Sequence, residues 1–163
     1  MAGHAPEVKI PQMPHLKAIV ITAAWHPDIC DALVAGAVRG FKESGIANPV
    51  VRTVAGSFEL PLAAQLAFDE GFDLAVVVGV VVRGETAHFD YVCQGVTDGV
   101  MQVSLSRSKP IGFGVLMCES VEQARARAGF ADSFEDKGFD SALAALSVLN
   151  NKKTIYIICM MQT

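Results

Sequence analysis

The sequence of 163 residues contains one tryptophan, two tyrosines and four cysteines. The cysteines lie far apart, without the close spacing of a paired metal-binding motif, and each of them follows an apolar residue. This arrangement predicts reduced thiols that fill the core of a cytoplasmic protein, with no structural metal site.

The chain also lacks an apolar run long enough to span a membrane. Its long uninterrupted run covers only residues 74–82, far short of the ~20 residues of a membrane-spanning helix. Residues 1–16 carry prolines and histidine but no long apolar stretch, which argues against a signal peptide. We therefore expect no membrane partner, and we expect residues 1–15 to form an extended or disordered N-terminal arm.

Charged residues are sparse. Thirteen Lys and Arg residues stand against 17 Asp and Glu residues, which gives a formal charge of −4, and no basic stripe is present. These features argue against a nucleic-acid partner. With 52% hydrophobic and 18% charged residues, the chain is too apolar to be disordered and has apolar surface left over for contacts between subunits.

Short apolar runs alternate with segments of helical periodicity. Pro27 suits the first turn of a helix, and Gly45, Gly71 and Pro110 are expected to end helices. The predicted strands cover residues 18–24, 50–54, 73–82 and 111–117. The predicted helices cover residues 27–44, 59–68, 88–109, 121–128 and 139–149. This alternation predicts an α/β fold, a three-layer α/β/α sandwich around a central four-stranded parallel sheet.

One domain is expected over residues 16–150, followed by a C-terminal tail over residues 151–163. The tail contains an apolar segment, residues 154–161, after a polar run. The sequence leaves three alternatives open for this segment: a fifth strand, a segment that contacts another subunit, or a disordered end.

The first three predicted strands end in residues that can carry chemistry. These residues are Trp25-His26, Gly56-Ser57-Phe58-Glu59 and Gly84-Glu85-Thr86-Ala87-His88. The carboxyl ends of parallel strands lie side by side at one edge of a sheet, where open α/β folds bind ligands. Trp25 and Phe58 can sandwich a flat heterocycle, a glycine turn that opens a helix can bind phosphate, and His88 can transfer protons.

Each of these residues also has a simpler structural interpretation. A lone tryptophan after a strand often only packs, Glu59 suits the first turn of a helix, and Arg83 can pair with a surface carboxylate. His88 alone fits a helix start as well as it fits catalysis. The predicted proximity of all three strand ends is what favours a ligand site.

Two segments carry a family resemblance. Residues 56–61 (Gly-Ser-Phe-Glu-Leu-Pro) and 82–92 (Val-Arg-Gly-Glu-Thr-Ala-His-Phe-Asp-Tyr-Val) resemble the two signature segments of the lumazine synthase family. Further matches follow in the family's order at residues 110–111, 113–116, 127–129 and 137–138. The resemblance covers about residues 17–149 and implies a flavodoxin-like form of the sandwich.

The resemblance implies a transferase of riboflavin biosynthesis that forms 6,7-dimethyl-8-ribityllumazine. In the family's reaction, 5-amino-6-(D-ribitylamino)uracil condenses with 3,4-dihydroxy-2-butanone 4-phosphate, and water and phosphate are lost. The amine attacks the ketone to form an imine, phosphate is eliminated, and the ring closes. These steps are proton transfers between oriented reactants, so the resemblance implies no metal and no cofactor.

By resemblance, the ends of the first three strands bind the pyrimidine and its ribityl chain. The tryptophan takes the place of a phenylalanine that stacks on the pyrimidine. The serine segment contacts the ribityl chain, and backbone groups at the end of the third strand meet the pyrimidine edge. The expected contacts are Trp25, Ser57, Phe58, Glu59, Val80, Val81 and Val82.

A second set of residues is expected to serve the phosphate group and the proton transfers. By resemblance, Glu85 and Thr86 lie in the phosphate loop, and His88 is the proton donor and acceptor. Arg127 is expected to clamp the phosphate with its fork of donors, and Lys137 is a weaker member of the same site.

The resemblance also implies a homopentamer whose active sites lie between neighbouring subunits. Phe113 is expected to line the pocket of the neighbouring subunit. Some family members assemble twelve such rings into a shell. The loop between Arg127 and Lys137 is two residues longer than in many relatives and lies near the shell contacts, which favours a lone pentamer.

Two departures from the family pattern lie in the expected site. Trp25-His26 replaces the usual Phe-Asn, which keeps the stacking surface and leaves the role of His26 open. Glu85 brings a negative charge beside the phosphate loop, which is tolerable only if its side chain points away and its amide binds.

Two other classes of function fit parts of the pattern. A flavin- or lumazine-binding carrier would keep the pocket, but it needs neither a phosphate clamp nor a group that transfers protons. A flavodoxin-like electron carrier needs a Ser/Thr/Gly-rich loop after the first strand, whereas this chain has Ala-Ala-Trp-His-Pro at residues 23–27. The enzyme is therefore the preferred hypothesis.

Overall fold

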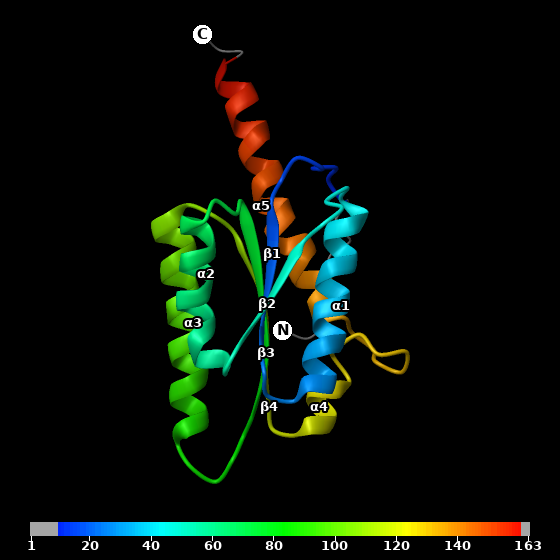
Figure 1. The fold of residues 1–163 in the computed structure, drawn as a ribbon, viewed down its shortest axis with the longest axis vertical. Helices are drawn as coiled ribbons and strands as arrows, with labels where there is room; N and C mark the ends of the chain where they lie inside the picture. The colour runs from blue at the N-terminus through cyan, green and yellow to red at the C-terminus, as the bar shows by residue number, and fades with distance from the viewer. Residues whose placement is uncertain (1–9, 161–163) are drawn as a thin grey trace.

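A parallel sheet of four strands forms the centre of the molecule. The computed structural model describes residues 10–160. The strands are β1 (Ala18–Ala23), β2 (Val50–Val54), β3 (Leu74–Val82) and β4 (Ile111–Cys118). They pair in the order β2-β1-β3-β4, and every pair is parallel (Figure 1). Continuous apolar runs form β1 and β3 because both of their faces are covered by helices.

Helices cover both faces of this sheet. In Figure 1, α2 and α3 lie on one side of the strands, and α1, α4 and α5 lie on the other. Their bounds are α1 (Pro27–Glu43), α2 (Leu60–Asp69), α3 (His88–Arg107), α4 (Val121–Arg125) and α5 (Lys137–Met160), with a short 3₁₀ helix η1 (Ser57–Glu59) before α2. The predicted three-layer α/β/α sandwich is therefore confirmed.

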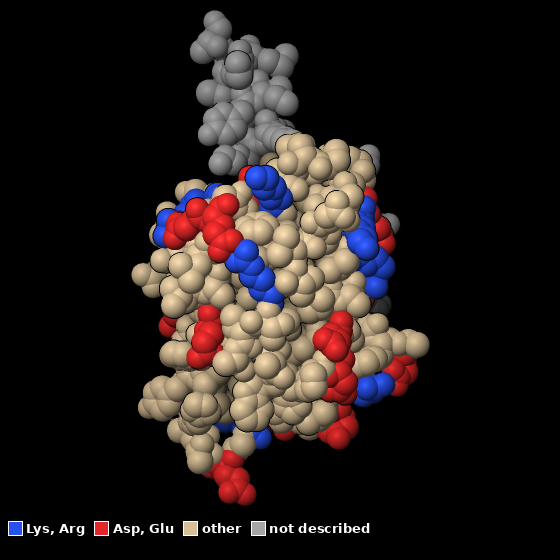
Figure 2. All heavy atoms as spheres, viewed as in Figure 1, with Lys and Arg blue, Asp and Glu red and all other residues tan. Residues whose placement is uncertain are grey.

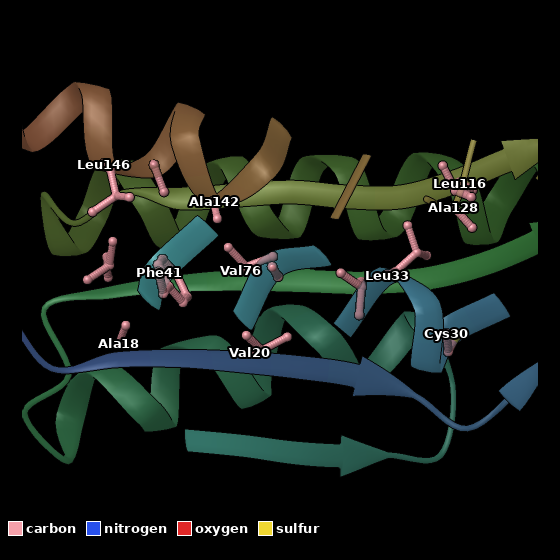
Figure 3. Close-up of a cluster of buried hydrophobic side chains, with 14 of the residues drawn as sticks. Ala18, Val20, Cys30, Leu33, Phe41, Val76, Leu116, Ala128, Ala142 and Leu146 are labelled. Atoms are coloured by element: carbon pink, nitrogen blue, oxygen red, sulfur yellow. The ribbon is translucent and has the colours of Figure 1, made fainter. Parts of the chain in front are cut away.

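The core consists of two apolar clusters, one on each face of the sheet. Alternate residues of β1 point to opposite faces, so that Val20 joins the cluster under α1 and α5, and Ile21 joins the one under α2 and α3. Figure 3 shows the first cluster, in which Leu33 and Phe41 of α1 approach Val20 and Val76 of the sheet. Val96, Val100 and Val103 of α3 are buried in the second cluster.

Glycines let α1 and α5 approach each other closely. A β-carbon placed on Gly138, in the first turn of α5, would lie 2.0 Å from the carbonyl oxygen of Leu33 in α1. One placed on Gly40 would lie 2.8 Å from the β-carbon of Ala142. The two helices therefore pack backbone against backbone at this crossing, which leaves no room for a side chain.

The start of α5 and the end of α4 both lie earlier than predicted. α5 begins at Lys137, two residues before the predicted start at residue 139, because the Asp136 carboxylate accepts a hydrogen bond from the backbone N–H of Phe139 (2.9 Å) and so caps the helix. α4 ends at Arg125, earlier than the predicted residue 128, because the chain turns toward Glu135, whose carbonyl accepts a hydrogen bond from the N–H of Gly129 (3.1 Å).

The expected arm and tail are only partly described. α5 continues to Met160, so residues 154–160 are helical and do not form a fifth strand, and residue 161 lies outside the described range. The first nine residues of the predicted arm also lie outside it. No helix of the described residues is long and apolar enough to cross a membrane.

Cys30, Cys93 and Cys118 are free thiols, as predicted. Cys30 and Cys118 are buried, and Cys93 is half-buried. Burial raises the pKa of the Cys30 thiol, so that it stays protonated and donates to a backbone oxygen.

Candidate functional site

A cavity of about 770 Å³ opens at the carboxyl ends of β1, β2 and β3; we call it the strand-end cavity. η1 and the first turn of α3 complete its wall. Eight of the predicted site residues line it: Trp25, Ser57, Phe58, Glu59, Val80, Val81, Val82 and His88. The strand ends that lie far apart in the sequence therefore meet as predicted.

Trp25 stands at the mouth of this cavity on a constrained turn. Its side chain is 69% exposed, so it does not serve as core packing. The next residue, His26, has a left-handed backbone (φ 53°, ψ 63°), a conformation that His and Asn adopt more readily than most residues. The Cys30 thiol donates a hydrogen bond to the Trp25 carbonyl oxygen (3.1 Å), which stabilises the turn.

The segment after β2 presents Phe58 and Glu59 to the cavity. Phe58 is 59% exposed and lies over α3 at Gly95, where an added β-carbon would be 2.6 Å from the ring. The Ser57 side chain is buried, and its hydroxyl has no hydrogen-bond partner among the described residues. A small residue is therefore required beneath Phe58, and the Ser57 hydroxyl is a buried polar group without a partner among the described residues.

Arg83 anchors both ends of the loop that leads to His88. Its guanidinium pairs with Asp90 (3.0 Å), beyond the loop, and with Glu119 (3.0 Å), after β4. It also lies over the Phe89 ring, 4.1 Å from the centroid. The hydrogen bonds that Arg83 donates to the carboxylates of Asp90 and Glu119 raise its pKa, so that it stays charged. The predicted surface ion pair is confirmed, and it holds the intervening loop in place.

His88 is the first residue of α3 and is exposed at the wall of the strand-end cavity. Its backbone N–H approaches the Thr86 hydroxyl at 3.4 Å, and no side chain caps the helix at Ala87. Glu85 and Thr86 are exposed in the loop and line neither cavity. The loop therefore presents backbone amides at a helix N-terminus, which suits an anion.

A second cavity, of about 380 Å³, runs along the open edge of β4; we call it the edge cavity. Phe113, Arg127 and Lys137 line it, together with Cys118 and Gln123. No residue lines both cavities. Of the thirteen predicted residues, eight thus line the strand-end cavity, three line the edge cavity, and Glu85 and Thr86 line neither.

The two cations of the edge cavity are paired within the chain. Arg127 Nε lies 3.5 Å from a carboxylate oxygen of Glu135, and Lys137 Nζ lies 3.1 Å from the other oxygen. Partial burial disfavours the charged form of Lys137, but Glu135 and Asp140 outweigh it and raise the pKa of Lys137. The Lys137 side chain therefore carries a positive charge at neutral pH.

Comparison with known proteins assigns the family. A sequence profile described as 6,7-dimethyl-8-ribityllumazine synthase matches residues 15–153. The chain belongs to this family. It is 46% identical to the 6,7-dimethyl-8-ribityllumazine synthase of Streptomyces coelicolor, over 93% of this chain and 94% of the relative.

Two further relatives carry the same name. The 6,7-dimethyl-8-ribityllumazine synthase of Frankia casuarinae is 49% identical over 87% of this chain and 89% of its own. The one of Mycobacterium avium is 45% identical over 88% of this chain and 92% of its own. The resemblance on which the sequence analysis relied is therefore confirmed over nearly the whole chain.

Three residues near the two cavities had no role assigned from the sequence motifs of this lumazine synthase family chain. Tyr91 lines the strand-end cavity one helical turn after His88, a spacing that places both on one face of α3. His26 lines it beside Trp25. The ion pair of Glu135 with Arg127 was not predicted, because no local sequence pattern indicates an ion pair that forms across a loop. Among the described residues, no group of three or more His, Cys, Asp or Glu is arranged to hold a metal ion.

Proposed function

We propose that this protein catalyses the condensation of 5-amino-6-(D-ribitylamino)uracil with 3,4-dihydroxy-2-butanone 4-phosphate. The products are 6,7-dimethyl-8-ribityllumazine, phosphate and water, as in the penultimate step of riboflavin biosynthesis. The strand-end cavity carries this proposal, because it unites an exposed tryptophan, the segment 57–59 and a histidine in one lumazine synthase family chain. We also propose a cytoplasmic location.

The strand-end cavity suits the pyrimidine substrate. The exposed rings of Trp25 and Phe58 offer flat apolar faces to the heterocycle. The Glu59 carboxylate accepts hydrogen bonds from the ribityl hydroxyls, and Ser57 lines the cavity beside it. The backbone at the end of β3, residues 80–82, meets the pyrimidine edge.

His88 is assigned the proton transfers. It lies at the wall of the cavity, where the amine attacks the ketone and the imine later loses phosphate. Its imidazole can accept a proton from the attacking amine and return one to the leaving water. The turn and α3 backbone amides around it face the substrate's phosphate end.

We propose that neighbouring subunits of a homopentamer complete each active site. Within one chain, Arg127 and Phe113 line the edge cavity, whereas His88 lines the strand-end cavity. A second subunit is therefore needed to bring the Arg127 phosphate clamp next to His88. Large apolar side chains are exposed on α2 and α3 and offer surface for such contacts: Leu62, Leu66, Tyr91, Met101 and Leu105.

Figure 2 shows basic side chains interspersed with acidic ones on the face in view, without one basic patch.

The assembly is expected to be a lone pentamer. The chain has a mass of 17.3 kDa, so light scattering of the protein in solution should report about five times that value. The longer loop between Arg127 and Lys137 is the reason for this expectation. A particle of about sixty chains would contradict it.

One assay tests the proposed function. The two substrates are mixed with the protein, and lumazine formation is followed by absorbance while free phosphate is measured in parallel. An enzyme releases one phosphate for each lumazine formed, whereas a carrier binds lumazine without releasing phosphate. Absence of both products would refute the proposal.

Replacement of Arg127 by alanine should raise KM for the butanone phosphate more than it lowers kcat. The lost charged hydrogen bonds are worth about 1.5–3 kcal/mol, and the low end is expected because Glu135 already engages this guanidinium. Arg125→Ala is the matched control, since Arg125 stacks on Phe130 and lines neither cavity. Equal effects of the two substitutions would argue against a phosphate clamp.

A further inference from the structure

One carboxylate bridges the two cations of the edge cavity. The oxygens of Glu135 lie 3.5 Å from Arg127 Nε and 3.1 Å from Lys137 Nζ, and its side chain is only 29% exposed. Arg127 and Lys137 both line the cavity. A phosphate group between the same two cations would use the same donors, because both anions accept charge-assisted hydrogen bonds.

The backbone around Glu135 is fixed independently of this carboxylate. The N–H of Gly129 donates to the Glu135 carbonyl (3.1 Å), and the N–H of Lys137 donates to the Arg127 carbonyl (3.0 Å). Among the described residues, the carboxylate itself forms ion pairs with Arg127 and Lys137 only. The Glu135 side chain can therefore leave its place by rotation, without unfolding the loop.

We propose that Glu135 is a resident counter-anion of Arg127 and Lys137, which the phosphate group of the substrate displaces. This inference rests on the proposed function, because it places the displacing group at the same site. No covalent bond changes in this step: the carboxylate leaves two cations, and a dianion with more acceptor oxygens takes its place. The substrate phosphate thus binds against an internal competitor.

The two cations do not depend equally on Glu135. Lys137 Nζ has a second carboxylate partner, Asp140, at 3.3 Å. Arg127 keeps a hydrogen bond to the carbonyl oxygen of Gln123 (2.8 Å) and lies 5.1 Å from the centroid of the Phe134 ring. These contacts hold the guanidinium in the cavity after Glu135 has left. The same carboxylate can return when inorganic phosphate is eliminated, which favours release of that product.

The test compares Glu135→Gln with Asp132→Asn in the full-length protein. Asp132 is exposed in the same loop and forms no ion pair with any residue that the structure describes, so its substitution removes an equal charge from the loop alone. Inorganic phosphate is titrated by calorimetry, and its inhibition of lumazine formation is measured. Glu135→Gln should tighten phosphate binding by roughly three- to tenfold, the scale of a partly exposed ion pair, and Asp132→Asn should leave it unchanged.

The possible outcomes separate this inference from the proposed function. Unchanged or weaker phosphate binding by Glu135→Gln overturns the inference, and weaker binding would mean that Glu135 orients Arg127 instead. Equal tightening in both variants also overturns it, because the net charge of the loop would then be the cause. A wild-type protein that forms no lumazine refutes the proposed function, whereas the calorimetric comparison still decides the role of Glu135.

Discussion

Replacement of His88 by alanine is expected to lower kcat for lumazine formation by roughly ten- to a thousandfold, the usual contribution of general acid–base catalysis. The histidine is exposed at the wall of the strand-end cavity, and its side chain supports neither the core nor the start of α3. Its loss should therefore leave the fold intact. Oriented amine and ketone groups react readily without help, which favours the lower end of this range.

The control for this variant is Asp98→Asn, farther along α3. Asp98 pairs with Gln94 on the same helix and lines neither cavity, so its substitution should leave kcat within twofold or so of the wild type. KM for the pyrimidine should stay nearly constant in His88→Ala, because Trp25 and Phe58 provide the stacking surface. If His88→Ala kept the full wild-type kcat, the assigned role would be untenable.

Replacement of Gly138 by alanine is expected to destabilise the protein by more than about 3 kcal/mol, at the upper end of overpacking effects. The added β-carbon would lie 2.0 Å from the carbonyl oxygen of Leu33 and 2.8 Å from its carbonyl carbon. Both of these are backbone atoms, so no side-chain rotation relieves the clash. The start of α5 must move away from α1, and the apolar contacts of that crossing open with it.

The prediction is tested by measuring the free energy of unfolding in urea for Gly138→Ala and for the control Gly84→Ala. Gly84 has no heavy atom within 4 Å of an added β-carbon, so its substitution should change the free energy of unfolding by less than about 0.5 kcal/mol. If Gly138→Ala does not fold, it should be absent from the soluble fraction while Gly84→Ala remains soluble. That result would also show that Gly138→Ala is strongly destabilising. Equal unfolding midpoints for the two variants would contradict the close approach of α1 and α5.

The sheet and the strand-end cavity were predictable because local patterns determine them. Buried parallel strands are continuous apolar runs, so β3 was expected at residues 73–82 and lies at Leu74–Val82. A parallel sheet brings the carboxyl ends of its strands together, which places Trp25 and His88 in one cavity once the strands are known.

The remaining features depend on contacts that no local pattern encodes. The early start of α5 follows from the Asp136 carboxylate, which caps that helix at the N–H of Phe139. The Glu135 bridge joins residues across a loop whose charges appear in the sequence as an ordinary polar segment. The left-handed turn at His26 is likewise a backbone feature, and histidine adopts that conformation more readily than most residues.

Trp25 is the sole tryptophan of the sequence, and it stands at the mouth of the strand-end cavity with 69% of its side chain exposed. Indole emission excited near the red edge of its absorption therefore arises from this one place in each subunit. A flat ligand that stacks on the ring should quench that emission and shift it to shorter wavelength as water is displaced. The protein thus carries its own optical probe of site occupancy, and binding can be titrated without a label or turnover.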